Sequence, residues 1–311
     1  MRQIKLGNID YMSQRWVALV FSGVLFAITF ASLAIQGLNY GLDFTGGTVL
    51  EVGYQEPIDT ADISAALESV GVPGVTVQYF GTNRDVLLRI PPTGETNNAA
   101  LSQKVFDTLS AAVGGKAELR RVEFVGPQVG EELTEKGGLA VLYSLLGLLS
   151  YVALRFEWRF AVGAVAATIH DAIIVLGVFS VFQLDFDLNV LASILTVVGY
   201  SLNDTIVIFD RVRENFRKMR KGTPLEIMNQ SVNETMSRTI ITAGTVFLVV
   251  VALYLFGGET LRGFSLALIV GVISGTFSTI YIASNVAILL GVSRHDLMPT
   301  PKEGPSVDAR P

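Results

Sequence analysis

The residue of this chain that most directly suggests chemistry is an aspartate inside an apolar stretch long enough to cross a membrane. Asp204 follows Leu188 by 16 residues in the stretch 188–209. An ionisable side chain deep in a bilayer costs about 2.5–3.5 kcal/mol on insertion scales, so it is tolerated mainly where it carries ions or protons. Asp204 therefore indicates a membrane protein that couples its work to an ion gradient.

Other polar residues belong to the same predicted site. His170 and Asp171 stand near the centre of the third apolar stretch, and Arg238 stands at the start of the fifth. At about 1.5 Å per residue, Asp171 lies at the midplane, with Asp204 about 9 Å and Arg238 about 13 Å toward the cytoplasm. We expect these residues, with Asn203, to form a proton pathway in which a proton passes from Asp171 through water to Asp204. Movement of Arg238 relative to Asp204 then loads and releases the proton, driven by about 2.3 kcal/mol per charge per 100 mV of membrane potential.

The residues around Asp204 also have a structural interpretation. Asp204 and Arg238 can form a static ion pair. Asn203, Ser201 and Thr205 can join neighbouring helices by hydrogen bonds. Both interpretations stay open at the level of sequence.

The histidine and a second aspartate raise the same question. His170 points about 100° away from Asp171 on a helix, so it is as well suited to packing as to proton transfer. Asp210 ends its stretch beside two arginines, and we expect it at the membrane surface without a proton-carrying role.

Six apolar stretches are long enough, or nearly so, to cross a bilayer, for which a helix needs roughly 20 residues. They are 17–37, 137–154, 160–182, 188–209, 239–256 and 263–292. The first is longer than a signal-peptide core, so we expect an uncleaved anchor.

Arginine and lysine in short loops predict the orientation, because such loops stay in the cytoplasm. They gather between the second and third stretches and between the fourth and fifth: Arg155, Arg159, Arg211, Arg213, Arg217, Lys218, Arg220 and Lys221. Both termini, 1–16 and 293–311, are therefore predicted to be cytoplasmic, and 38–136 to face outward. The basic run 211–221 and the polar run after it suggest an amphipathic segment at the lipid surface, or else a contact for a cytoplasmic partner. The proline-rich tail suggests disorder.

Composition limits the function further. Hydrophobic residues make up 50% of the chain and charged residues only 16%, which is too apolar for an ordinary soluble protein. A net charge of -5 without a basic stripe argues against nucleic-acid binding. The absence of cysteine excludes disulfides and thiolate metal sites, and no phosphate-binding glycine loop of the Walker type is present. We expect no enzyme activity, no metal and no cofactor.

The outward insertion 38–136 is predicted to be a folded α+β domain. Alternating β-branched residues predict strands at 48–54, 75–80, 85–90 and 118–125, and helical spacing predicts helices at 60–70 and 97–113, with Gly71 and Gly114 as stops. The order strand, helix, strand, strand, helix, strand is that of a ferredoxin-like domain. The predicted fold is thus a bundle of six transmembrane helices with one inserted periplasmic domain.

The segment from Gly41 to Gly47 joins the first membrane stretch to this domain. It is either a glycine turn whose Asp43 and Thr45 satisfy backbone groups, or a hinge or partner contact formed by Asp43, Thr45, Gly46 and Gly47. Small residues such as Gly271, Ser274, Gly275 and Ser278 predict closely packed helices without specifying a task.

Several motifs together resemble the SecF family, membrane subunits of the SecD and SecF accessory complex of the bacterial protein-export translocase. They are Gly41-Leu-Asp-Phe-Thr-Gly-Gly47, Phe124-Val-Gly-Pro-Gln-Val-Gly130, His170-Asp171, Gly199-Tyr-Ser-Leu-Asn-Asp-Thr205 with Asp210-Arg-Val-Arg-Glu-Asn215, and Tyr254-Leu-Phe-Gly-Gly258. The resemblance covers about residues 10–295. It implies a bundle of the resistance-nodulation-division type in the bacterial inner membrane.

The resemblance also implies partners and a role. The implied partners are SecD, which forms the other pseudo-symmetric half, a SecY-containing channel, the small subunit YajC, membrane lipid and the preprotein held by the outward domain. In the family a fourth-span aspartate and a fifth-span arginine are tied to proton use, and they match Asp204 and Arg238. The implied function is a non-enzymatic subunit that uses the proton-motive force to assist preprotein translocation and release.

Two other functions remain open. Half of a proton-coupled hydrophobe exporter would use the same relay but needs an apolar pocket in a larger outward domain. A non-conducting scaffold of the translocase would need no proton at all.

Overall fold

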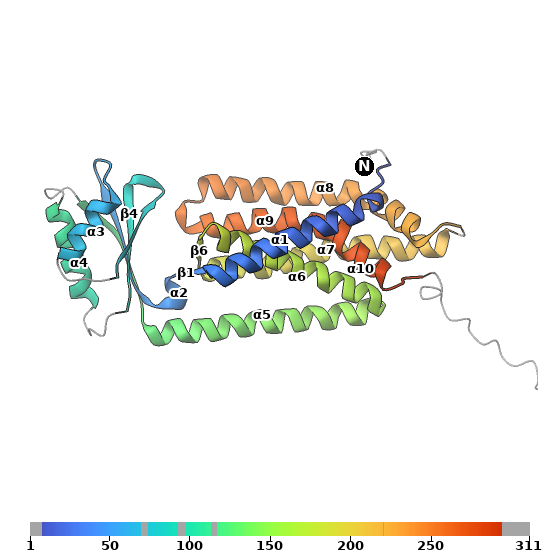
Figure 1. Ribbon diagram of the computed structural model, residues 1–311, viewed down its shortest axis with the longest axis horizontal. Helices are drawn as coiled ribbons and strands as arrows, with labels where there is room; N and C mark the ends of the chain where they lie inside the picture. The colour runs from blue at the N-terminus through green and yellow to red at the C-terminus, as the bar shows by residue number, and fades with distance from the viewer. Residues whose placement is uncertain (1–7, 70–73, 93–97, 113–116, 220, 294–311) are drawn as a thin grey trace, which may run out of the picture.

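A computed structural model describes residues 8–69, 74–92, 98–112, 117–219 and 221–293. Most of the predicted tail, and the predicted helix stops at Gly71 and Gly114, lie outside these residues. Within them the chain forms a bundle of long helices with a small sheet domain beyond one end of the bundle, while the N-terminal end of the described chain lies at the other (Figure 1).

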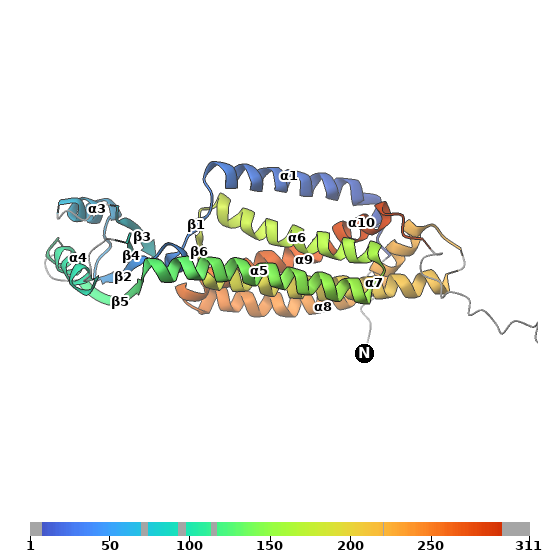
Figure 2. The ribbon, with the colours of Figure 1, turned by 90° about the horizontal axis from the view of Figure 1, so that it is seen from below.

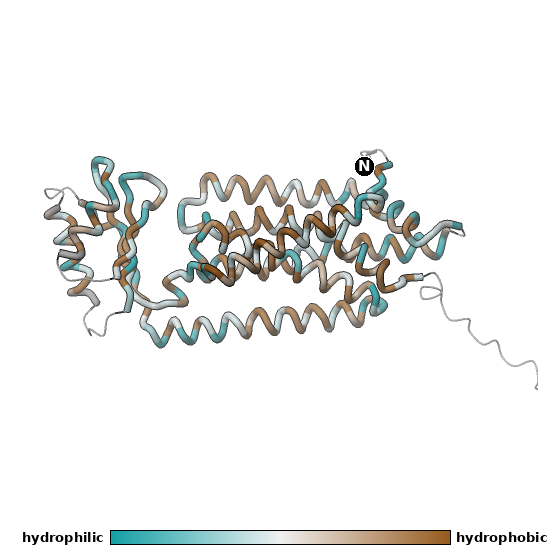
Figure 3. The backbone as a smooth tube through the Cα atoms, in the orientation of Figure 1, coloured by the Kyte–Doolittle hydropathy of each residue, from teal (hydrophilic) through white to brown (hydrophobic). Residues whose placement is uncertain are grey.

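Six helices of the described chain are long and apolar enough to cross a membrane. The first five are α1 (Arg15–Ile35, preceded by the short turn η1, Met12–Gln14), α5 (Pro127–Arg155), α6 (Trp158–Val181), α7 (Leu188–Lys218) and α8 (Pro224–Phe256). The sixth is continuous through four segments: η2 (Glu259–Leu261), α9 (Arg262–Ser278), the π-turn η3 (Thr279–Ala283) and α10 (Ser284–Leu289). Their middle sections are the apolar part of the molecule, and the sheet domain and the far ends of α7 and α8 are more polar (Figure 3).

Three of these helices extend well past the apolar stretches predicted from the sequence. Helix α5 begins at Pro127 rather than 137, α7 ends at Lys218 rather than 209, and α8 begins at Pro224 rather than 239. The start of α8 is stabilised by a capping box, in which Thr223 and Glu226 satisfy each other's backbone N–H groups. The basic run 211–221 therefore lies mostly in the last turns of α7, and its contact with lipid or with a cytoplasmic partner stays a prediction.

The bundle has an inner and an outer set of helices. Helices α6, α7 and α9 bury much of their surface, whereas α1, α5 and α8 lie outside them with large apolar side chains exposed (Figure 2). Small residues permit the close inner contacts. A Cβ on Gly271 would lie 2.1 Å from Val197, and one on Gly163 would lie 2.7 Å from the carbonyl of Ala283.

The sheet domain contains the elements β2 (Gly47–Tyr54), α3 (Thr60–Ser69), β3 (Thr76–Phe80), β4 (Thr82–Ile90), α4 (Asn98–Ala112) and β5 (Ala117–Val125). The four strands form an antiparallel sheet in the order β3-β4-β2-β5. Both helices lie on the sheet face that points away from the bundle (Figure 1). Leu50, Val52 and Leu88 on that face pack with Leu67 and Leu109 of the helices, and this is the domain's own core.

A small second sheet joins the two parts of the molecule. Strand β1 (Asn39–Tyr40) pairs in parallel with β6 (Asp185–Phe186), which connects α6 to α7. The one-turn helix α2 (Leu42–Thr45) follows β1 and leads through Gly46 into β2. The segment that enters the sheet domain is thus attached to the start of α7.

Candidate functional site

The predicted residue Asp171 lies on α6 and is completely buried, with its carboxylate surrounded by hydrogen-bond donors. Ser274 donates to Oδ1 at 2.6 Å, while Ser201 and Ser278 donate to Oδ2 at 2.5 and 2.8 Å. His170 Nδ1 lies 3.2 Å from Oδ1. Both carboxylate oxygens of Asp171 therefore have hydrogen-bond donors from the protein itself.

His170 extends this network to the outer helix α1. Its Nε2 lies 3.0 Å from the hydroxyl of Ser22. If Nδ1 carries the proton and donates to Asp171, then Nε2 accepts from Ser22 and both ring nitrogens are satisfied. The ring also packs between Phe26 and Phe277, with centroid distances of 5.3 and 6.0 Å. The ring of His170 is therefore both hydrogen-bonded and packed, and its part in proton transfer stays a prediction.

Asp204 lies on α7, is 3% exposed, and has a different environment. Its carboxylate interacts electrostatically with Arg238 and with the hydroxyl of Thr242, both on α8. The Thr242 hydroxyl is within hydrogen-bonding reach of Asp204 and also donates to the Arg238 carbonyl at 3.0 Å, while the described part of the chain gives Asp204 no ion pair within 4.0 Å. Tyr200, one turn earlier on α7, interacts electrostatically with the Asp204 carboxylate and with Thr242. Asp204 is thus buried near a cation without being fixed to it.

The two remaining members of the predicted pathway lie at the edge of this chain. Asn203 and Arg238 are both exposed, although each is close to Asp204 in the fold or the sequence. Asn203 belongs to an exposed line along α7 with small or polar members spaced by four, three and four residues: Ala192, Thr196, Gly199 and Asn203. The pocket around Asp204 is therefore open on one side in this chain alone.

Ser201 connects the surroundings of the two aspartates. Its hydroxyl donates to Asp171, and its backbone carbonyl accepts the Thr205 hydroxyl at 3.2 Å. The Thr205 hydroxyl in turn lies 2.9 Å from that of Thr279, the first residue of the π-turn. Asp204 lies between Ser201 and Thr205 in the sequence. The polar residues near Asp171 and those near Asp204 are therefore neighbours on the same stretch of α7. Their participation in proton transfer stays a prediction.

The serines that donate to Asp171 are the functional contacts that sequence reasoning missed. From the sequence, Ser274 and Ser278 were predicted only to be small packing residues. Their hydrogen bonds go to the Asp171 carboxylate, more than 100 positions away, which the sequence does not indicate. A signal was present in their spacing of four residues, which places both hydroxyls on one face of α9. π-turns are often found at functional sites, and here one begins at the residue after Ser278.

Asp210 lies apart from this network, near the end of the bundle that carries the N-terminal segment. Arg155 lies 3.1 Å and Arg213 lies 3.5 Å from its carboxylate, and both arginines are partly exposed. Asp210 is thus ion-paired outside the network, and its place at the membrane surface stays a prediction. Among the described residues, no group of three or more His, Cys, Asp or Glu side chains is arranged to hold a metal ion.

The four predicted residues of the glycine segment lie at the other end of α7, between the bundle and the sheet domain. Asp43 accepts a hydrogen bond from the backbone N–H of Leu188 at 3.0 Å, and Thr45 donates to the carbonyls of Gly41 and Gly46. Asp187 accepts from the N–H of Val190 at 2.8 Å. Burial raises the pKa of Asp187, the hydrogen bond from Val190 opposes that rise, and the carboxylate of Asp43 adds to it.

Positions 46 and 47 require glycine, both because their backbone conformation disfavours a side chain and because neighbouring atoms lie close. Both have positive φ, of 66° and 116°, which side-chain-bearing residues rarely adopt. A Cβ on Gly47 would lie 2.4 Å from the carbonyl oxygen of Ile90, and one on Gly46 would lie 3.1 Å from Cα of Pro127. The segment is packed against α7, α5 and the sheet at once.

Comparison with known proteins was made on the whole chain. The family "Protein export membrane protein SecD/SecF, C-terminal" matches residues 105–293, and the "SecD/SecF GG Motif" matches residues 31–58. The chain is 50% identical to protein translocase subunit SecF of Vibrio alginolyticus, over 98% of this chain and 97% of that protein. It is also 50% identical to the SecF of Pseudomonas aeruginosa, over 99% of each.

A solved structure is similar as well. The crystal structure of SecDF, a translocon-associated membrane protein from Thermus thermophilus, matches with a TM-score of 0.82 and 33% identity. The match covers 92% of this chain and 39% of the SecDF chain. This chain therefore corresponds to well under half of the longer protein.

Proposed function

Since this chain belongs to the SecF family of protein translocase subunits, we propose that it uses the proton-motive force, with SecD, to assist preprotein movement through a SecY-containing channel. The observation that carries this proposal is the state of Asp204, a buried carboxyl on a membrane helix that no close ion pair neutralises. Such a group can take up and release a proton when its distance to a cation changes.

Arg238 is the group whose distance changes. It lies on α8, which packs against the outside of α7 and α9, and its side chain is exposed. A cation at the edge of the site can approach or leave Asp204 without breaking a close ion pair. Asp171 and His170 then supply hydrogen bonds beside the path, or Asp171 passes a proton through water to Asp204 as predicted from the sequence.

A SecD partner is supported by the open side of the site. An exposed asparagine and an exposed arginine on membrane helices are costly to leave in lipid. The line of small residues on α7 lets another helix approach closely, and a Cβ on Gly199 would meet no atom within 4 Å. A second membrane subunit that covers this face would enclose Asp204, Arg238 and Asn203 together.

We place the chain in the bacterial inner membrane with both termini in the cytoplasm. Arg155 ends α5, Arg159 lies in the first turn of α6, and Arg211 and Arg213 lie in the last third of α7. These parts of the helices are at the end of the bundle opposite the sheet domain, and positive residues favour the cytoplasmic side (Figure 1). The sheet domain is then periplasmic, and we interpret it as ferredoxin-like from its strand order and its two helices on one face. A periplasmic reporter inserted after residue 116 should be active, and activity only of a cytoplasmic reporter there would reverse this orientation.

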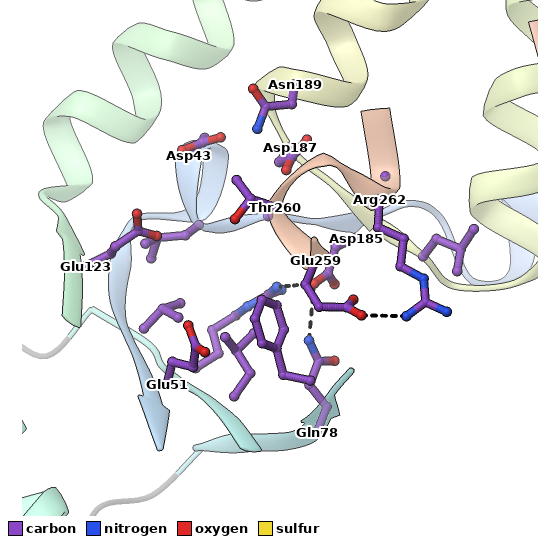
Figure 4. Close-up of a pocket in the computed structure, with 18 of the residues that line it drawn as sticks. Asp43, Glu51, Gln78, Glu123, Asp185, Asp187, Asn189, Glu259, Thr260 and Arg262 are labelled. Carbon is purple, nitrogen blue, oxygen red and sulfur yellow. Dashed lines mark hydrogen bonds and ion pairs between the residues drawn. The ribbon is translucent and has the colours of Figure 1, made fainter. Parts of the chain in front are cut away.

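The space between the sheet domain and the bundle argues against hydrophobe export. A pocket of about 540 Å³ lies there, and six carboxylates and three arginines are among its lining residues (Figure 4). They are Asp43, Glu51, Glu123, Asp185, Asp187 and Glu259, with Arg89, Arg121 and Arg262. An apolar substrate would have to strip water from these charges, which is unfavourable.

The test is preprotein translocation in membrane vesicles that contain this chain, SecD and the channel, with and without a proton gradient. Asp204→Asn should lower export to the level seen without a gradient, because the amide cannot exchange a proton. Asp210→Asn is the matched control, since it makes the same change to another aspartate of α7 that we place at the membrane surface. This variant should keep gradient-dependent export.

Each outcome has a defined meaning. Loss of only the gradient-stimulated part in Asp204→Asn supports proton use at this residue. Gradient-stimulated export that survives the substitution assigns the proton to another group. Wild-type export that ignores the gradient favours the scaffold role instead. Hydrolysis of ATP by the purified chain would contradict the proposal that it is not an enzyme.

A further inference from the structure

The segment between α1 and the sheet domain is attached to the first turn of α7 by its backbone and its side chains. We call residues 39–47 the linker. Its strand β1 pairs with β6, the Gly41 N–H donates to the carbonyl of Phe186 at 2.8 Å, and Asn39 Nδ2 donates to Asp185 Oδ1 at 2.7 Å. Asp43 accepts from the N–H of Leu188 at 3.0 Å. The first N–H groups of a helix have no partner within it, so Asp43 caps α7 from a distant part of the sequence.

Aromatic packing adds to this attachment. Phe44 of the linker stacks on Phe186, with ring centroids 5.9 Å apart and an interplanar angle of 26°. Phe186 also contacts Tyr40 of the linker and Phe179 at the end of α6. On the other side, a Cβ on Gly130 of α5 would lie 3.1 Å from the carbonyl oxygen of Phe44. The linker is therefore packed between α5 and the connection from α6 to α7.

The other end of the linker continues directly into β2, an inner strand of the sheet. Strand β2 pairs with both β4 and β5, so a displacement of β2 moves the sheet as a unit. Gly47 lies too close to the Ile90 carbonyl to admit a side chain. No flexible stretch separates the start of α7 from the sheet.

Elsewhere the sheet meets the bundle where β5 continues through Gly126 into α5 and through polar contacts around the pocket (Figure 4). Arg89 and Gln78 contact Asp185 at 3.0 and 3.1 Å, and Arg121 contacts Thr260 at 3.4 Å. These are polar and partly exposed contacts that water can replace. The main described connection from α7 to the sheet is the linker.

We propose that the linker transmits displacement of α7 to the sheet domain, with Asp43 as the positioning residue that keeps the linker on the helix. Leu188 and Asp204 are on the same helix, about 24 Å apart at 1.5 Å per residue. A shift of α7 caused at Asp204 is therefore carried along a rigid element to the linker and then to β2. This inference rests on the proposed function, since it needs a proton-driven displacement of α7.

The first test uses Asp43→Ala in vesicles that contain the full complex, with export and proton uptake measured together. Gradient-stimulated export should fall to the level seen without a gradient, because α7 loses the acceptor that holds the linker, while proton uptake, read by a pH-sensitive dye, stays at the wild-type rate. Asp43→Asn keeps an acceptor oxygen and should restore export. Asp59→Ala is the control, because Asp59 makes a similar cap, to the N–H of Ala61 at 2.9 Å, away from the linker.

The outcomes separate this inference from the proposed function. Unchanged gradient-stimulated export in Asp43→Ala overturns the role of the linker. Loss of proton uptake together with export also overturns it, because Asp43 would then only support the fold of α7. Wild-type export without any gradient dependence overturns the proposed function itself.

A cross-link distinguishes rigid transmission from a hinge. Asn39 and Asp185 are paired neighbours in the parallel strands, about 4.8 Å apart by strand spacing and within disulfide range. The chain has no cysteine, so Asn39→Cys with Asp185→Cys introduces a single pair. Oxidation should leave gradient-stimulated export at the level of the reduced form of the same variant. Inhibition on oxidation that a reductant reverses would mean that the linker must leave β6, which overturns the proposal.

Discussion

Asp171 and Asp204 are two buried aspartates on neighbouring helices of the same bundle, and they are surrounded in opposite ways. Three serine hydroxyls and a histidine nitrogen lie within 3.2 Å of the Asp171 carboxylate. Asp204 interacts with an arginine and a threonine and has an open side toward the surface of the chain. Burial is nearly the same for the two residues, so burial alone does not assign a role to either.

The difference lies in the partners that each carboxylate holds. The Asp171 carboxylate is the shared acceptor of a network that joins α1, α6, α7 and α9, so this side chain supports the packing of those helices. Asp204 interacts only with Arg238 and Thr242, and among the described residues it has no ion pair within 4.0 Å. From this comparison we predict that Asp171 serves chiefly stability and Asp204 chiefly proton exchange, and substitutions can test each half.

The largest effect is expected from Asp171→Ala. Removing the acceptor leaves buried serine hydroxyls and an imidazole without a partner, and breaking a buried charged network in this way costs about 3–5 kcal/mol. The measurement is unfolding in mixed detergent micelles, with Asp210→Ala as control. Asp210 is a partly exposed carboxylate between two arginines, and its loss should cost below about 1 kcal/mol. If Asp171→Ala is as stable as Asp210→Ala, the network is not what holds these helices together.

A smaller effect is expected from removing a single donor. Ser274→Ala leaves Oδ1 of Asp171 with only the His170 contact among the described residues, and a hydrogen bond to a charged group is worth about 1.5–3 kcal/mol. Ser265→Ala is the matched control, because Ser265 is also buried on α9 but donates to the carbonyl of Leu261, one turn earlier in the same continuous helix. Equal stability of the two variants would show that the donors around Asp171 are interchangeable with ordinary helix contacts.

The sequence predicted the elements better than the contacts between them. Strand patterns at 48–54 and 118–125 lie within one residue of β2 and β5, because alternation of side chains is a local property. Helix ends at Pro127 and Pro224 were missed, since apolar stretches mark the part inside the bilayer and not the polar turns beyond it. Pairing of β1 with β6 involves two residues on each side, separated by about 145 positions, and no periodicity indicates it.

The candidate site was predicted in part for a similar reason. Asp204 and Asp171 are evident because charge is rare inside apolar stretches. The environment that separates their roles comes from Ser274 and Ser278, whose sequence context indicates only small size. The exposure of Arg238 and Asn203 depends on the packing of α8 against α7 and could not be read from spacing. Sequence identified the charges, and the fold shows which one is fixed.

The smallest effect on stability is expected at Asp204, the second aspartate of the comparison. Asp204→Asn should destabilise the protein by less than about 1.5 kcal/mol, the lower limit for a hydrogen bond to a charged group, because the described chain gives this carboxylate only the Arg238 and Thr242 interactions and no ion pair within 4.0 Å. The measurement is the same unfolding experiment in micelles, and the export assay on the same preparation supplies the function. Unchanged stability with lost gradient-stimulated export would place proton exchange at Asp204. A loss of stability as large as that of Asp171→Ala would mean that Asp204 is also a packing residue, and the distinction between the two aspartates would fail.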